Sequence, residues 1–467
     1  MERSIGPLTT ATFVLRFATG LTGALLIFLL ADFSEHGGPE VGAYAVGLLT
    51  ALFFAAELVL SPPFGLLSDR LGHHRLMQVG PVFGLVAVIL TALTAELTLG
   101  PLLIAVPLLV GSLPLLGLTR LLEGASTAAS VPSVLGFMAV ATSGDEVLRG
   151  KASARFEAAT IAGLGLGFAV AGPVWTVFGP AGFLINAFVY VVALGLFRWH
   201  VPDVEQRPVQ PVASAGWQRY RRLLRRSRVW LLAPTWIALN AGLGLYTSQT
   251  LFQLVRTPDP RFANQSLVGG FEPLAVTAAF LAGGAIFLVG LVYWGGRFAV
   301  LRRTTIIFYG IVGGVIFVVA ALLLNHSGDS PALLRLPTLL GLGFGLFLIA
   351  GATPAALGLL ADMSESFPLD RGAVMGLYSV FLALGQIAGA LLGAALAERW
   401  AFDGILLATL LLQAVALMPL ARLRRFELLF QHTAASGPDP ESAVVDLSVT
   451  RAYRIDPPAG PGRAGPD

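Results

Sequence analysis

The chain has 467 residues, of which 55% are hydrophobic and 12% charged, whereas a typical soluble protein has about 25% charged residues. This composition excludes a soluble domain of such length and predicts an all-α integral membrane protein. The net charge of +3 is too small to indicate a nucleic-acid partner, and the lack of cysteine excludes disulfides, thiol catalysis and cysteine-bound metals.

Each crossing of a bilayer requires about 20 mostly apolar residues. The first such run follows an N-terminus without a small-residue cleavage site, so we interpret it as a membrane helix and not as a removed signal peptide. The apolar runs predict twelve transmembrane helices, near 9–31, 43–64, 76–96, 113–141, 154–178, 182–199, 229–252, 273–294, 304–324, 336–361, 373–397 and 403–421.

The apolar segment 100–116 carries three prolines and either lengthens the third and fourth helices or forms an extra interfacial piece. A thirteenth crossing there would put the arginine-rich stretch 219–228 outside the cell. Twelve crossings with both termini inside satisfy the positive-inside rule. The outer loops then carry only four basic residues: Arg256, Arg261, Arg335 and Arg399.

Four regions follow from this topology: an N-terminal six-helix bundle (1–200), a basic cytoplasmic linker (201–228), a C-terminal six-helix bundle (229–421) and a tail (422–467). Arginines and apolar residues in the linker predict an interfacial helix that touches anionic lipid, with a specific partner site as the alternative. The Pro- and Gly-rich tail is predicted to be disordered.

An internal repeat relates the two bundles. The offset that maps Pro132 onto Pro354 also maps Gly136 onto Gly358 and Arg149–Gly150 onto Arg371–Gly372. It further pairs Gly163 with Gly385 and Gly167 with Gly389. Each bundle thus has a small-xxx-small pair of the kind that lets membrane helices approach closely, so the halves are predicted to be pseudo-symmetric.

The charged stretch "GLLSDRLGHHR" lies between the second and third helices. It resembles the signature of the major facilitator superfamily in this loop, with His73 and His74 where basic residues are usual. The matching residues are Gly65, Leu67, Asp69, Arg70, Gly72 and Arg75. The resemblance implies an inner gate in which Asp69 meets the start of the eleventh helix, near Arg371. In the second half Trp294 stands at the position of Asp69, which makes the gate one-sided.

Two further stretches are similar to patterns of this family. "RLLEGASTAA" matches a fourth-helix pattern at Arg120 and Gly124. "GLGLGFAVAGP" is similar to a fifth-helix pattern of proton-driven exporters through Gly163, Gly172 and Pro173. Thr176 and Val177 replace the closing glycines of that pattern.

Ionisable residues inside a membrane cost at least about 2.5–3.5 kcal/mol each and need a reason. Arg16 and Glu57 lie at similar depths and form either a static ion pair or a proton or anion site. Arg120 and Glu123 share one helix face and either neutralise each other or assist proton transfer, as an arginine does there in proton-coupled relatives.

The seventh helix is unusually polar. Asn240, Tyr246 and Gln249, together with Gln386 and Tyr378 of the eleventh helix, either line a cavity or join helices by hydrogen bonds. An apolar cavity with a few polar groups would accept an amphipathic organic molecule.

Nothing in the sequence indicates an enzyme, a metal site or a cofactor. The six histidines fall in predicted loops or the tail, and metalloprotease, phosphate-loop and nucleophile-elbow motifs are absent. The first hypothesis is a monomeric transporter of the cell membrane that exports small amphipathic compounds by proton antiport, with bacterial origin indicated by the arginine bias. The alternatives are an importer or facilitator of an anionic metabolite, and a receptor or scaffold on the same fold.

Overall fold

The computed structural model describes residues 2–36, 38–95, 113–142, 146–203, 229–298, 300–328, 331–365, 371–425 and 427. Every secondary-structure element assigned within these ranges is helical, which confirms the predicted all-α class. The chain divides into a compact unit, Met1–Leu420, and a second unit, Ala421–Asp467. The helices described below belong to the first unit.

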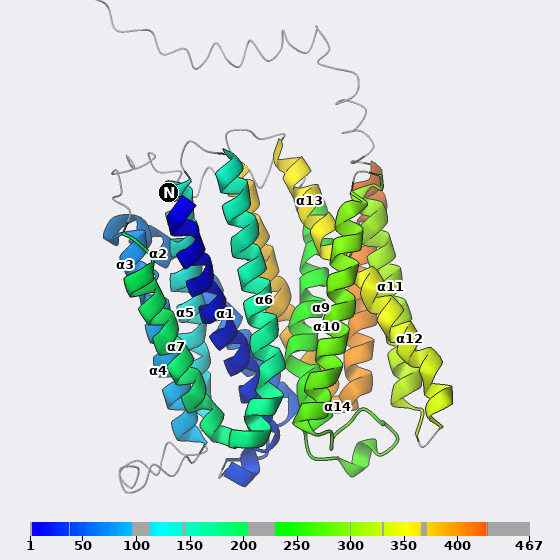
Figure 1. Ribbon diagram of the computed structural model, residues 1–467. Helices are drawn as coiled ribbons and strands as arrows, with labels where there is room; N and C mark the ends of the chain where they lie inside the picture. Colours follow the sequence, from blue (N-terminus) through cyan, green and yellow to red (C-terminus); the bar gives the residue numbers. More distant parts are fainter. Residues whose placement is uncertain are drawn as a thin grey trace, which may run out of the picture. The chain divides into compact units, whose positions relative to one another are not determined.

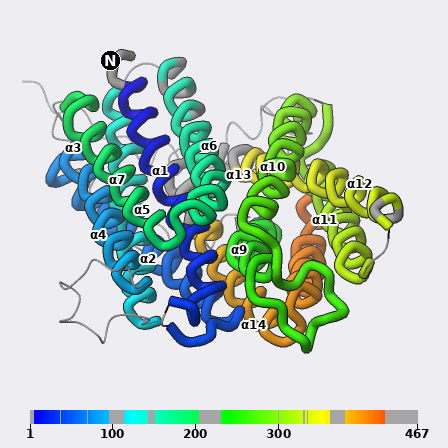
Figure 2. The backbone as a smooth tube through the Cα atoms, turned by 60° about the horizontal axis from the view of Figure 1, so that its bottom comes forward, coloured from blue at the N-terminus to red at the C-terminus, as the bar shows by residue number. Residues whose placement is uncertain are grey.

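The first group of helices precedes residue 204 and forms one bundle (Figures 1 and 2). Short 3-10 turns follow its first and fifth long helices. The elements are α1 (Glu2–Ala31), η1 (Phe33–His36), α2 (Ala43–Leu71), α3 (His73–Leu76), α4 (Val79–Thr94), α5 (Leu113–Ala141), α6 (Glu146–Phe178), η3 (Gly179–Ala181), α7 (Gly182–Gly195) and its π-helical extension η4 (Leu196–His200).

The second group begins at residue 229 and forms the other bundle (Figure 2). Its last helix contains one non-helical residue, Ala401, at φ 48° and ψ −125°, which separates two successive crossings. The elements are α9 (Val229–Val255), η5 (Pro260–Phe262), α10 (Pro273–Gly296), α11 (Arg303–Asn325), α12 (Ala332–Ile349), α13 (Ala352–Glu365) and α14 (Arg371–Leu417).

The described helices account for the twelve predicted crossings. Nine stretches among the described residues are long and apolar enough to span a membrane. Two of them, Lys151–His200 and Val380–Arg425, each contain two consecutive crossings. The remaining crossing is α9, which is not one of these nine stretches.

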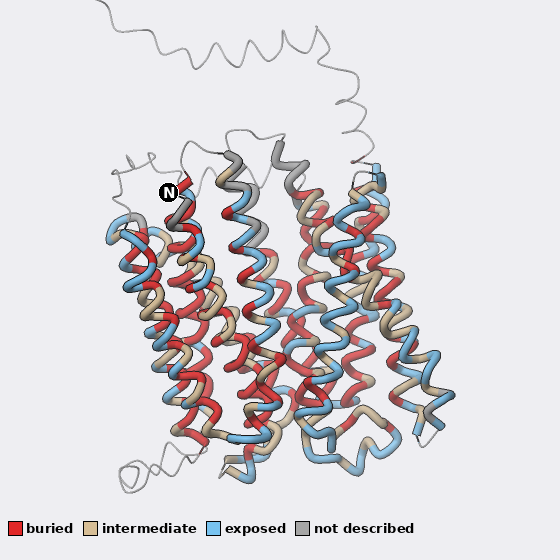
Figure 3. The backbone as a smooth tube through the Cα atoms, in the orientation of Figure 1, coloured by how far each residue is buried: buried red, intermediate tan, exposed pale blue. Residues whose placement is uncertain are grey.

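Burial follows what a lipid-embedded bundle requires. The interior of α1 is packed by leucines such as Leu21, Leu25 and Leu29, which are almost fully buried. On α10 and α12, in contrast, large apolar side chains such as Val292 and Leu340 are exposed (Figure 3). Such surfaces suit a lipid solvent, in which apolar side chains need no protein cover.

The sequence predicts a loop at Gly65–Arg75, but most of this connection between the second and third crossings is helical. Residues Gly65–Leu71 continue α2 as a helix, and the chain turns only at Gly72, whose φ of 100° favours glycine. His73 and His74, expected in a loop, lie buried in α3. A helix can continue beyond the apolar run that crosses the membrane, because water and capping side chains can both satisfy the backbone groups at its end.

Several predicted regions fall partly or wholly outside the described residues. Of the proline-containing segment 100–116, only residues 113–116 are described, and they open α5. The basic stretch from 204 to 228 and the tail from 428 onward also lie outside the described ranges.

Candidate functional site

Two oppositely charged residues, one helical turn apart, form an ion pair inside the N-terminal bundle. On α5 the Arg120 Nη2 and Glu123 Oε2 atoms form a close ion pair, with side chains 6% and 1% exposed. The Arg120 guanidinium also lies 6.0 Å from the ring centroid of Phe53 on α2. Within the described part of the chain, Arg120 Nε and Glu123 Oε1 have no hydrogen-bond partner. The pair therefore keeps unused hydrogen-bonding capacity in a dry environment.

Arg16 of α1 is also buried. Its Nη1 lies 3.5 Å from Thr127 Oγ1, which links α1 to the polar face of α5. Glu57 on α2 and Glu157 on α6 are the carboxylates close enough to act on this guanidinium electrostatically. Among the described contacts Arg16 makes no direct ion pair with Glu57, and Glu57 is only partly buried. Charges from α1, α2 and α5 thus occupy the interior of one bundle.

The repeated glycines make the same contact in both bundles. A Cβ at Gly163 would lie 2.6 Å from Phe13 O and 2.8 Å from the Cβ of Arg16. A Cβ at Gly385 would lie 2.6 Å from Ile237 O and 2.8 Å from the Cβ of Asn240. Arg16 and Asn240 therefore hold matching places on α1 and α9, with a charge in one bundle and an amide in the other.

The second glycine of each pair tightens the same junctions. A Cβ at Gly167 would lie 2.1 Å from Phe17 O, and a Cβ at Gly389 would lie 1.8 Å from Ala241 O. Gly172 lies beside Pro273 O of α10, and Pro173 follows it inside α6. These glycines set the spacing of the helices that carry the site residues.

The polar residues of α9 join helices. Tyr246 OH lies 2.8 Å from Thr409 Oγ1 on α14, and Gln249 Nε2 donates to Ala43 O of α2 at 3.1 Å. Asn240 instead donates to Trp236 O within its own helix. Gln386 is buried, and the side chain of Tyr378 is outside the described part. These contacts match the hydrogen-bonding interpretation for Tyr246 and Gln249.

Two histidines make hydrogen bonds on either side of the turn at Gly72. Ser68 Oγ lies 2.6 Å from His73 Nδ1, and His74 Nε2 donates to Val201 O at 2.9 Å. Arg70 and Arg75 are exposed. The side chains of Asp69 and Arg371 lie outside the described part. In the second half, Trp294 donates from Nε1 to Phe347 O at 2.9 Å and so joins α10 to α12.

Two polar residues were missed in the sequence. Thr127 partners Arg16, and Gln413 packs its amide against Gly314 while its Oε1 lacks a partner among the described residues. A glutamine in the apolar run 403–421 was a visible signal. Among the described residues no group of three or more His, Asp or Glu side chains is arranged to hold a metal.

Comparison with known proteins gives consistent results. The model of a family described as "Major Facilitator Superfamily" matches residues 8–364. Quinolone resistance protein NorA of Staphylococcus aureus (strain COL) is 21% identical over 406 residues, covering 85% of this chain and 90% of the relative.

Solved structures share the fold. The chain superposes on a D-xylose-proton symporter with a TM-score of 0.65 and 15% identity, over 89% of this chain and 98% of the other. It superposes on the nucleoside transporter NupG with a TM-score of 0.58 and 14% identity, over 90% and 98%. At such identities the likeness establishes the fold alone.

Proposed function

Because the chain belongs to the major facilitator superfamily of membrane transporters, we propose that it exports small amphipathic organic compounds in exchange for protons. The bundles 1–200 and 229–421 rock against each other and expose a shared central site to one side of the membrane at a time. The protein acts as a monomer in the cell membrane, with lipid around it and both termini in the cytoplasm.

The observation that carries the proton coupling is the cluster of ionisable groups inside the first bundle. Arg16, Glu57, Arg120 and Glu123 occupy membrane helices, where each charge costs at least about 2.5–3.5 kcal/mol on insertion scales. Glu57 is less buried than Glu123 and so is the more accessible carboxylate for proton exchange. The second bundle contributes uncharged polar groups on α9, which suit an amphipathic substrate.

The direction and substrate class draw support from the relatives. One relative is named for quinolone resistance, and removal of such a compound from the cell would produce resistance. One structural neighbour is a proton symporter by name. The buried Arg16 and Arg120 favour a second candidate, an importer or facilitator of an organic anion.

Transport by the purified protein in proteoliposomes tests these functions. We expect a fluorescent quinolone to move in the direction opposite to the protons that an imposed pH gradient drives across the membrane. This movement should stop when an ionophore collapses the gradient. Movement that ignores the gradient would indicate a facilitator. Transport of organic anions but not quinolones would favour the second candidate.

Glu57→Gln tests the proton site. The amide keeps the shape of the side chain but cannot exchange a proton, so we expect the pH dependence of transport to flatten while the folded yield stays unchanged. Transport by Glu57→Gln and by the parent is compared between about pH 5.5 and 8.5, a range in which a buried carboxyl group with a raised pKa or a histidine changes its charge. Glu40→Gln, an exposed glutamate in the loop before α2, is the control. A parental pH profile in Glu57→Gln would remove Glu57 from the coupling mechanism.

Asp69→Asn tests the inner gate implied by the motif. An anion at the start of a helix is stabilised by about 0.3–1 kcal/mol, an energy that a gate can make and break in each cycle. We expect slower transport with normal expression, measured as the initial rate per folded protein. Asp203→Asn, an exposed aspartate after η4, is the matched control. Equal rates in Asp69→Asn and the parent would contradict the gate.

A further inference from the structure

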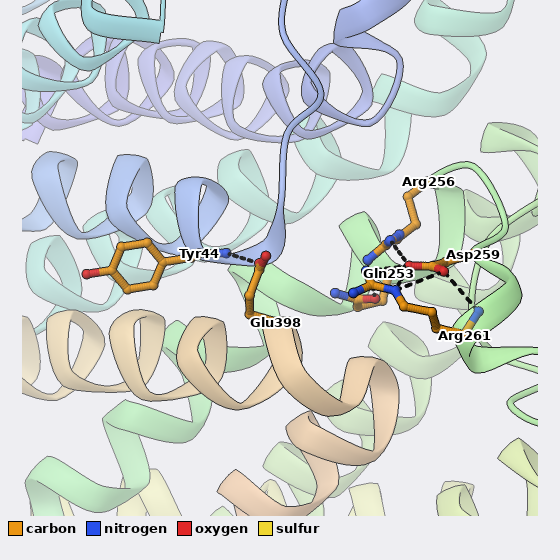
Figure 4. Close-up of polar contacts among 6 residues, drawn as sticks. All are labelled: Tyr44, Gln253, Arg256, Asp259, Arg261 and Glu398. Carbon is orange, nitrogen blue, oxygen red and sulfur yellow. Dashed lines mark hydrogen bonds and ion pairs between the residues drawn. The ribbon is translucent and has the colours of Figure 1, made fainter.

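The start of α2 is capped by a residue from another helix. The N-cap position is Gly42, which has no side chain to accept a hydrogen bond from the free backbone N–H groups. Instead, Tyr44 N–H donates to Glu398 Oε2 of α14 at 2.9 Å (Figure 4). A carboxylate at this position also interacts favourably with the positive end of the helix dipole.

Small residues bring α2 and α14 together at this point. A Cβ at Gly42 would lie 2.7 Å from each carboxylate oxygen of Glu398. One at Gly47 would lie 2.3 Å from the Cβ of Ala394 and 2.5 Å from Ala390 O. At Gly42 and Gly47, α2 therefore packs against α14 so closely that a side chain on either glycine would collide with it.

A third helix reaches the same place. Gln249 of α9, fully buried, donates from Nε2 to the carbonyl of Ala43 in the first turn of α2. Helices of the two bundles thus meet at one end of the molecule, which we call the Gly42 end. Gly172 of α6 and Thr277 of α10 also pack together near this end, since a Cβ at Gly172 would lie 2.0 Å from Thr277 Oγ1.

Glu398 has a charged neighbour in Arg261, which belongs to an ion-pair cluster in the loop after α9. In the loop after α9, Asp259 accepts hydrogen bonds from Arg261 Nη2 at 2.7 Å and from Arg256 Nη2 at 3.3 Å (Figure 4). Hydrogen bonds from Arg261 hold the pKa of Asp259 below its ordinary value, so this carboxylate stays ionised. Two arginines face one aspartate, and Glu398 is close enough to act electrostatically on Arg261.

We propose that Glu398 is a positioning residue of the transport cycle, which holds the Gly42 end closed by capping α2 from α14. The proposal rests on the alternating-access function proposed above. Glu398 is exposed, so water can replace Tyr44 N–H when the helices separate, and the contact is reversible. Its geometry is the converse of the predicted inner gate, in which Asp69 near the end of α2 meets the start of α14.

Thiol labelling tests this role without transport. The chain has no cysteine, so Ala43→Cys introduces one thiol at a fully buried position of the contact. In detergent, a maleimide should label this thiol at least roughly threefold faster when Glu398→Ala removes the cap. Loss of an N-cap typically shifts the equilibrium between the capped and the open helix end by about that factor or more. Glu398→Gln keeps an acceptor but no charge and should give an intermediate rate.

The control is Glu272→Ala. Glu272 is an exposed glutamate at the N-cap of α10, and its side chain makes no cap hydrogen bond. We expect it to leave the labelling rate unchanged. Unchanged labelling in both Glu398 variants, or an equal increase in Glu272→Ala, would overturn the proposal. Since labelling needs no substrate, a protein that transports nothing in proteoliposomes would still report the gate, and the two failures remain distinguishable.

Discussion

Arg120→Met is expected to destabilise the protein severely. The substitution leaves Glu123 as an unpaired carboxylate that is almost fully buried, and removing one partner of such a pair typically costs about 3–5 kcal/mol. We expect a marked fall in the temperature at which the detergent-purified protein aggregates. The fall is measured by size-exclusion chromatography after heating.

The double variant Arg120→Met with Glu123→Leu separates stability from function. Replacing both partners by apolar residues is often neutral or stabilising, so most of the lost stability should return. Proton-coupled transport should not return if the pair takes part in coupling. Arg399→Met, at an exposed arginine of α14, is the control and should behave as the parent. A double variant as unstable as the single one would show that the two residues act independently.

Gly389→Ala is expected to have the second large effect. The added Cβ would lie 1.8 Å from Ala241 O and 2.5 Å from its carbonyl carbon, so α14 and α9 would have to move apart. Overpacking of this kind costs about 1–3 kcal/mol, and more where only backbone can yield. The fraction of monodisperse protein after purification measures the loss.

Gly242→Ala is the matched control on the neighbouring helix. A Cβ there meets nothing within 4 Å, and alanine is a better helix former than glycine by about 1 kcal/mol. We expect Gly242→Ala to be neutral or slightly stabilising. Equal loss in both variants would mean that the close approach of α9 and α14 does not limit folding.

Much of the fold was predictable because lipid imposes a simple rule on sequence. A run of apolar residues long enough to cross the membrane must be helical, and the fourth predicted run, 113–141, coincides with α5. The same rule failed at Gly65–Leu71, where charges suggested a loop although α2 continues to Leu71. Hydropathy reports the membrane boundary, and helices end where caps and turn residues allow.

The candidate site was less predictable. The glycine repeat identified the junctions at Gly163 and Gly385, since close approach requires small residues. The partners of Tyr246 and Gln249 depend on how α9 is rotated against α14 and α2, and hydropathy carries little information on rotation. Arg16 and Glu57 matched in depth, yet Arg16 lies against Thr127. Equal depth in the membrane does not bring two side chains together, because a contact also depends on which helices are neighbours and on how each is rotated.

The turn at Ala401 has a consequence for how the last hairpin can evolve. One non-helical residue joins the two crossings of α14, and Gly404 follows with its Cβ position only 2.2 Å from Leu396 O. An inserted residue would rotate the final crossing by about 100°. Leu407 and Leu411, which now face outward at 40% and 46% exposure, would turn toward neighbouring helices. A helical insertion at this turn is therefore expected to destabilise the packing of the last helix.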